Sequence, residues 1–139
     1  MRERETALAV DIGGTKIASG IVDDNGELLD RYREPTDDSS DEALYQQVLR
    51  LAVRARAAAA TEPIACGIGT GGPARDSHRL LSPLNIAVWS DFPLQERLQV
   101  DLGLPVHIDN DAKALALAEG WKGAAAGVQN FIGMVVSTG

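Results

Sequence analysis

The stretch TALAVDIGGTKIASGIVDDNG, residues 6–26, decides the fold. It contains two apolar runs, 6–12 and 16–22, and glycines 13 and 14 between them permit a tight turn. The turn sequence DDNG closes the second run at residues 23–26. This pattern predicts two antiparallel strands, and residues 27–34 add a third strand that ends at Pro35.

The rest of the chain alternates helical and strand patterns. Ser39 and Glu42 form a capping-box pattern before apolar residues at helical spacing, which predicts a helix over 41–59. Further strands are expected at 64–68, 106–108 and 131–136, helices at 94–102 and 112–121, and a long loop over 69–93 with Trp89 as an anchor. The order predicts an α/β domain, residues 1–139, with a mixed sheet and helices on its faces.

The amino-acid composition limits the classes of partner that this protein can bind. Thirteen basic and twenty acidic residues give a net charge of −7, which repels nucleic acid and anionic lipid. The single cysteine, Cys66, cannot form an internal disulfide bond, and no apolar stretch approaches the length of a membrane span. We therefore expect a cytoplasmic protein that binds neither nucleic acid nor membranes.

A dinucleotide-binding pattern is present but lies in the wrong context. Gly67, Gly69 and Gly72 spell GxGxxG behind a predicted strand, and Asp91 follows about 20 residues later. The motif requires a helix that opens at its last glycine, whereas Pro73 and the residues after it show no helical periodicity. We do not expect a nicotinamide or flavin site.

The hexapeptide DIGGTK, residues 11–16, is more informative. Two glycines allow positive φ and close approach of N–H groups to an anion, while Thr15 adds a hydroxyl and Lys16 a positive charge. Asp11 beside them could position Mg²⁺, directly or through water. The alternative is an ordinary Gly-Gly hairpin with an aspartate at its mouth, and the hexapeptide alone does not decide between them.

Five segments in order resemble the ROK family of sugar kinases and related repressors, within the actin-like ATPase superfold. They are DIGGTK at 11–16, GIGTGGPAR at 67–75, SPLNIAVW at 82–89, IDNDAKALALAEGWKGAAAG at 108–127 and VVSTG at 135–139. The resemblance is greatest to glucokinase-like and N-acetylmannosamine-kinase-like members. It implies an RNase-H-like amino-terminal lobe, with the second lobe absent from this chain.

The resemblance also implies site residues. Asp111 would be the catalytic base, although by its position alone an aspartate at a helix start is a cap. Phosphate contacts would come from Gly13, Gly14, Thr15, Lys16, Thr138 and Gly139. Sugar contacts would come from Gly72, Asn85, Asn110 and Asp111.

Four residues depart from the family pattern. Gly71 stands where the family usually has Pro, Arg75 where it often has Asp, Asp109 in place of Glu, and Lys113 in place of Asn. Gly71 and Arg75 lie in the sugar loop, the loop around residues 71–75 that is expected to contact sugar. Asp109 and Lys113 lie around the turn that carries the expected base, Asp111.

The implied function is ATP-dependent phosphorylation of a hexose or N-acetylhexosamine hydroxyl, with ATP and Mg²⁺. Zinc would belong only to a missing second half, and the full-length protein would be a homo-oligomer. A sugar-responsive repressor is an alternative, but such repressors carry a helix-turn-helix before the first phosphate strand, and only five residues precede Thr6. A non-catalytic sugar-binding module is the third possibility. We expect residues 1–139 alone to be inactive.

Overall fold

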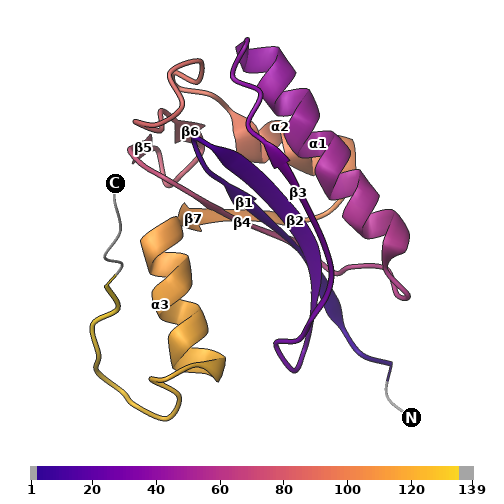
Figure 1. Ribbon diagram of the computed structural model, residues 1–139, viewed down its shortest axis with the longest axis vertical. Coiled ribbons are helices and arrows are strands. Elements are labelled where there is room, and N and C mark those ends of the chain that lie inside the picture. Colours follow the sequence, from indigo (N-terminus) through magenta and orange to yellow (C-terminus); the bar gives the residue numbers. More distant parts are fainter. Residues whose placement is uncertain (1–2, 135–139) are drawn as a thin grey trace.

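A five-stranded sheet in the order β3-β2-β1-β4-β7 forms the centre of the structure, a computed structural model that describes residues 3–134 (Figure 1). Its strands are β1 (Thr6–Ile12), β2 (Lys16–Asp23), β3 (Leu28–Pro35), β4 (Cys66–Thr70) and β7 (Val106–Asn110). The first three form an antiparallel meander, while β4 pairs in parallel with both β1 and β7. The predicted mixed sheet is confirmed.

Helices cover both faces of the sheet, as expected. The helices are α1 (Asp41–Ala58), α2 (Leu94–Leu102) and α3 (Asp111–Lys122). Helix α1 packs on β1, β2 and β3 and contacts α2, whereas α3 lies against β4 and β7 on the opposite face (Figure 1). Each expected helix agrees with an observed one to within one residue at either end.

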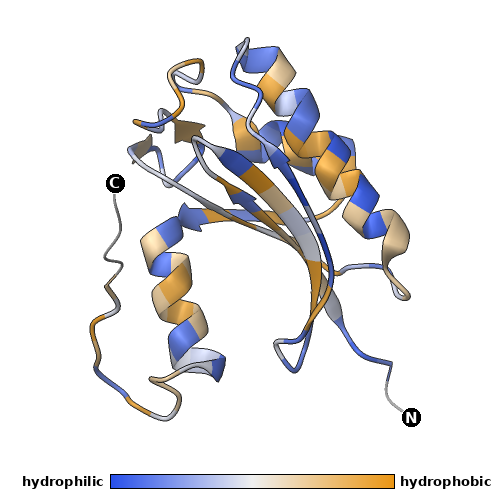
Figure 2. Ribbon diagram, viewed as in Figure 1, coloured by the Kyte–Doolittle hydropathy of each residue, from blue (hydrophilic) through white to orange (hydrophobic). Residues whose placement is uncertain are grey.

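The core lies between the sheet and α1. Leu8, Val10 and Ile12 alternate along β1 with the less buried Ala7, Ala9 and Asp11, so the large side chains face α1 and the small or polar ones face α3. Figure 2 shows the corresponding apolar stripe on the sheet-facing side of α1. The Ser19 hydroxyl joins the two layers, since it donates to the Leu51 carbonyl oxygen at 2.8 Å.

The cap of α1 differs from the predicted capping box. Ser40, not Ser39, is the N-cap, and its hydroxyl oxygen accepts the Ala43 N–H at 3.0 Å. The Ser39 hydroxyl instead donates to Asp37 at 2.6 Å. Adjacent serines are equivalent in a sequence pattern, and the entry path of the chain selects one of them.

The long loop after β4 is more ordered than expected. It contains a small hairpin of β5 (Ala74–Arg75) and β6 (Leu80–Leu81). Trp89 anchors the loop as predicted: its side chain is buried, its ring stacks on Phe92 at 4.6 Å, and its indole N–H donates to the Asp41 carbonyl oxygen at 3.1 Å. The loop is therefore attached to α1.

The carboxyl-terminal part differs most from expectation. Residues 131–134 form no strand, and the rest of the strand predicted over 131–136 lies outside the described residues. Helix α3 buries none of its residues, and Leu117 and Trp121 are more than half exposed. Within residues 3–134, every helix is too short or too polar to cross a membrane.

Candidate functional site

The turn between β1 and β2 is closed and supported by hydrogen bonds to backbone groups. The Gly13 N–H donates to the Lys16 carbonyl oxygen at 3.0 Å and closes the turn. Thr36 supports it twice, because its N–H donates to Thr15 O at 3.0 Å and its hydroxyl donates to Gly13 O at 2.7 Å. The described residues provide no acceptor for the N–H groups of Gly14 and Thr15. Two free donors therefore accompany the exposed Thr15 and Lys16 side chains.

Thr36 is a supporting residue that the sequence analysis missed. It follows Pro35 at the end of β3 and is 23 residues from Gly13. Only the pairing of β2 with β3, which sets Lys16 opposite Pro35, brings it to the turn. A threonine after a strand carries no local signal of this contact.

The requirement for glycine at position 14 has a different cause from the one expected. Neither Gly13 nor Gly14 has a positive φ, so the predicted left-handed conformation is absent. A Cβ placed on Gly14 would lie 2.7 Å from the Asn85 carbonyl oxygen and 2.8 Å from the Asn85 Cβ. Gly14 thus lets the β1–β2 turn at residues 13–15, the candidate phosphate turn, touch the segment expected to contact sugar.

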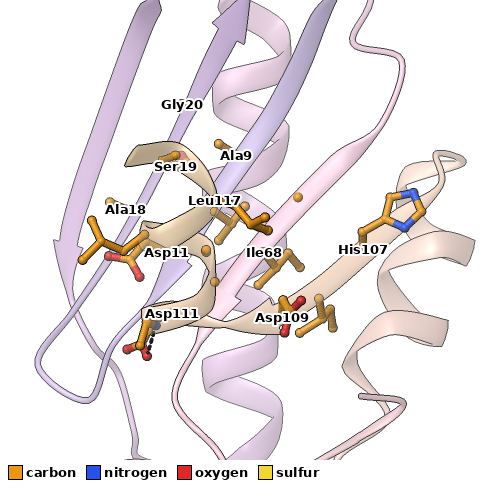
Figure 3. Close-up of a pocket in the computed structure, with 18 of the residues that line it drawn as sticks. Ala9, Asp11, Ala18, Ser19, Gly20, Ile68, His107, Asp109, Asp111 and Leu117 are labelled. Atoms are coloured by element: carbon orange, nitrogen blue, oxygen red, sulfur yellow. Dashed lines mark hydrogen bonds between the residues drawn. The ribbon is translucent and has the colours of Figure 1, made fainter. Parts of the chain in front are cut away.

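Asp11 lies at the end of β1 on the face that α3 partly covers. The sheet register places it opposite Gly69, which in turn pairs with Asp109. Partial burial and the negative charge of Asp111 raise the pKa of Asp11 above its ordinary value, and Lys16 and Arg31 oppose that shift. Figure 3 shows Asp11 and Asp111 near each other at one end of a cavity.

Asp111 is the first residue of α3, directly after β7. Its neighbour Asn110 is the N-cap, and the Asn110 Oδ1 accepts the Ala112 N–H at 3.0 Å. Asp111 Oδ1 accepts the same N–H at 2.8 Å, and the residue remains exposed. Asn110 thus fills the capping role, and the second oxygen of Asp111 forms no hydrogen bond with the described residues.

The candidate sugar residues form two contacts. A Cβ on Gly72 would lie 3.8 Å from Asn110 Nδ2, so the sugar loop approaches the end of β7. Asn85 instead meets Gly14 and the phosphate turn. These residues gather at the carboxyl ends of the parallel strands, where open α/β sheets bind ligands. Thr138 and Gly139 lie outside the described residues.

Three of the four departures from the family pattern are charged residues, and each forms an ion pair. Lys113 Nζ lies 2.8 Å from Asp109 Oδ2, so two of the substituted positions form one ion pair. This contact with Lys113, more than any other, lowers the pKa of Asp109. Arg75 pairs with Asp91 and joins the two ends of the loop around β5 and β6.

A cavity of about 1040 Å³ separates α3 from the sheet. The floor of the cavity consists of small residues on the strands, among them Ala9, Ala18, Gly20 and Gly67. Asp11 and Asp111 also line it (Figure 3). Among the described residues, no three or more Asp, Glu, His or Cys side chains group together as metal ligands. Two carboxylates still suit Mg²⁺, which binds through one or two carboxylates together with phosphate oxygens and water.

The glycine pattern of a dinucleotide site lacks its structural context, as predicted. Gly67 and Gly69 lie within β4, and the next element after Gly72 is the strand β5 rather than a helix. No helix N-terminus therefore stands where a pyrophosphate would bind.

Relatives of known activity match most of this chain. The glucokinase of Halalkalibacterium halodurans is 34% identical over 137 residues, which cover 95% of this chain and 41% of that protein. The N-acetylmannosamine kinase of Escherichia fergusonii is 34% identical over 135 residues, which cover 96% of this chain and 45% of that protein. The chain thus spans less than half the length of either relative.

A solved structure supports the same assignment. The ROK family glucokinase from Streptomyces griseus, in complex with glucose and AMPPNP, superposes with a TM-score of 0.79 at 33% identity, covering 88% of this chain and 38% of that one. ROK sugar kinases have the actin-like ATPase fold, so the expected fold class is confirmed. The family model described as "ROK family" matches residues 7–139, and the chain belongs to the ROK family.

Proposed function

We propose that residues 1–139 act as the amino-terminal lobe of an ATP-dependent kinase that phosphorylates a hydroxyl group of a hexose or N-acetylhexosamine. Its homologues are sugar kinases, and one of them binds glucose and AMPPNP. A second lobe would supply the adenosine site and the remaining sugar contacts. This chain would supply the first phosphate loop, the base and half of the sugar site.

The position of Asp111 carries the proposal. Its carboxylate is exposed beside Asp11, and its residue follows Asn110, whose amide faces the sugar loop at Gly72. The strand-to-helix junction and the capped first turn fix its backbone. Phosphoryl transfer to an alcohol requires one such carboxylate within hydrogen-bond reach of the hydroxyl.

In the proposed reaction, Asp111 accepts the proton of the sugar hydroxyl as that oxygen bonds to the γ-phosphorus. The bond from the γ-phosphorus to its bridging oxygen breaks, and ADP leaves. The free N–H groups of Gly14 and Thr15 and the Lys16 ammonium stabilise the phosphate oxygens from one side. Thr138 and Gly139 would contribute to the second phosphate loop.

The Mg²⁺ expected with ATP would be held by Asp11, directly or through water. The ion would neutralise charge on the β- and γ-phosphates. The raised pKa of Asp11 fits this role, because a cation beside Asp11 and Asp111 relieves their mutual repulsion. Gly72, Asn85 and Asn110 would orient the sugar, with Asn110 Nδ2 as a donor since Oδ1 caps α3.

Substitution of Asp111 by Asn in a two-lobe kinase containing these residues tests the proposal. We expect kcat to fall by about 10²-fold or more, because the amide cannot accept the proton. The sugar Kd should stay within about tenfold. A coupled assay for ADP measures turnover with a panel of hexoses and N-acetylhexosamines, and calorimetry measures sugar binding.

Asp24→Asn is the matched control, because Asp24 is exposed in the β2–β3 turn, far from Asp111. That variant should keep full activity. If Asp111→Asn retains more than a few per cent of kcat, the residue is a helix-start aspartate and another group is the base.

A further inference from the structure

A second, smaller cavity of about 290 Å³ lies at the carboxyl ends of β4 and β7, beneath the β5–β6 hairpin. Its lining includes Thr70, Gly71, Gly72, His78, Leu81 and Asn110. Gly72 and Asn110 are candidate sugar residues, so this cavity adjoins the proposed substrate site. Thr70 and His78 have no role in the site as described so far.

Thr70 carries an unusual polar atom. The residue is only 2% exposed, and its hydroxyl oxygen is, among residues 3–134, the buried side-chain nitrogen or oxygen atom that lacks any hydrogen-bond partner. A buried hydroxyl without a partner lowers the stability of the fold. Such a cost, borne at the wall of a cavity, indicates a partner that residues 3–134 do not provide.

The other groups around the cavity complement this hydroxyl. Asn110 uses Oδ1 to cap α3, which leaves its Nδ2 donors available. Leu81 supplies an apolar surface, and a Cβ on Gly71 would meet nothing within 4 Å, so there is open space beside Gly71. Hydroxyl and amide groups above an apolar floor suit a sugar ring, which has polar edges and apolar faces.

His78 limits the cavity on the outer side. Residues Asp76, Ser77 and His78 all have φ between 54° and 68°, in the left-handed region that non-glycine residues seldom adopt. His78 Nε2 lies 3.5 Å from Asp109 Oδ1, so the strained loop is attached to β7 next to Asn110. Strain of this kind concentrates at ligand sites.

We propose that this cavity is part of the sugar site and that the Thr70 hydroxyl forms a hydrogen bond with one hydroxyl or amide substituent of the bound sugar. The inference rests on the proposed function, and it makes Thr70 a residue that determines sugar specificity.

Thr70→Val separates binding from stability. Valine keeps the shape of threonine but has no hydroxyl, so the free energy of unfolding should stay equal or rise, because an unpaired buried group is removed. Sugar affinity should fall about tenfold. Thr70→Ser should restore affinity to within about threefold. Titration of the ¹⁵N-labelled chain with glucose, mannose and N-acetylmannosamine measures the Kd, which for one lobe we expect in the millimolar range.

A thermodynamic cycle that combines Thr70→Val with deoxy sugars identifies which sugar hydroxyl contacts Thr70. One of 2-, 3-, 4- and 6-deoxyglucose should bind the wild-type chain about tenfold more weakly than glucose, yet bind Thr70→Val as well as glucose does. Thr6→Val is the control, because Thr6 is also buried but its hydroxyl has a partner in Thr61. This variant should leave sugar affinity unchanged.

The results of these experiments distinguish a failure of the Thr70 proposal from a failure of the proposed kinase function. Sugar binding that Thr70→Val leaves unchanged, or a loss of stability in that variant, would overturn the role of Thr70 and leave the kinase proposal standing. Failure of the wild-type chain to bind any of these sugars, together with no turnover by the two-lobe protein, would overturn both.

Discussion

At the scale of single residues, the site is dominated by two like charges. Asp11 comes from a strand in the centre of the sheet and Asp111 from the start of α3, and each is placed by its own element. Partial burial of Asp11 and its repulsion by Asp111 raise the pKa of Asp11, so the charged form is unfavourable in the folded chain without a cation. The Asp11 carboxylate, which we propose holds Mg²⁺, therefore also lowers the stability of the folded chain.

Replacement of Asp11 by Asn should stabilise the isolated chain at pH 7. The folded pKa is raised, so the wild-type carboxylate destabilises the fold at every pH above that value. The penalty disappears as pH falls through the folded pKa toward the ordinary value. We expect a gain below about 1 kcal/mol, since solvent screens a partly exposed carboxylate. Urea unfolding between pH 7 and pH 4 measures it.

The pH trend is the decisive part of this measurement. The stability advantage of the Asp11→Asn variant over the wild type should shrink toward acid pH. An advantage that grows as pH falls would mean that the Asp11 carboxylate is favourable in the folded chain.

At the scale of elements, the phosphate turn depends on β3 as well as on its own hairpin. Thr36 holds Gly13 O through its hydroxyl and Thr15 O through its N–H, so the end of β3 fixes the conformation of a turn that precedes it. The free N–H groups of Gly14 and Thr15 are thereby held in place before any anion binds.

Thr36→Val should loosen this turn. The variant loses the bond from the hydroxyl to Gly13 O, which costs about 1 kcal/mol in stability. The Gly13 amide, which donates to Lys16 O, should exchange with solvent faster than in the wild type. Thr36→Ser retains the hydroxyl and should behave as the wild type. Urea unfolding and NMR hydrogen exchange measure both effects, and equal exchange in the two variants would refute the supporting role.

At the scale of the whole molecule, the proposed function makes this chain one wall of a site shared with a second lobe. The cavity between the sheet and α3 is floored by small residues, and α3 leaves Leu117 and Trp121 exposed. The described residues bring the candidate phosphate turn, the candidate base and the candidate sugar residues to one end of the sheet. In-line transfer also requires the γ-phosphate and the hydroxyl to be enclosed a few ångströms apart.

Residues 1–139 alone should therefore show no hexose kinase activity. Loss of positioning can account for several kcal/mol of the barrier, and the chain spans only 41% of its glucokinase relative. A coupled assay with MgATP and a panel of hexoses and N-acetylhexosamines measures turnover, with the two-lobe protein as the positive control. Sustained turnover by the purified chain would show that one lobe contains a complete site.

The sequence by itself determined the three helices and the five strands of the central sheet, but not the β5–β6 hairpin or the absence of a strand at 131–134. Alternating or periodic apolar residues, the glycine turn at 13–14 and the strand-to-helix junction at Asp111 are local patterns, and local patterns set secondary structure. Their order also fixed the mixed sheet, because short connections leave few topologies. The candidate roles of Asp11 and Asp111 came from short motifs, DIGGTK for Asp11 and the resemblance of residues 108–127 to the family for Asp111.

Only the tertiary structure decided which residues meet. Gly14 is required by its contact with Asn85, 71 positions along the chain, and not by its own backbone angles. Thr36 reaches the phosphate turn through strand pairing, and Thr70 is left without a partner by the loop folded over it. These contacts arise from packing between distant segments, where distances of a few tenths of an ångström decide what fits, and local patterns carry no record of them.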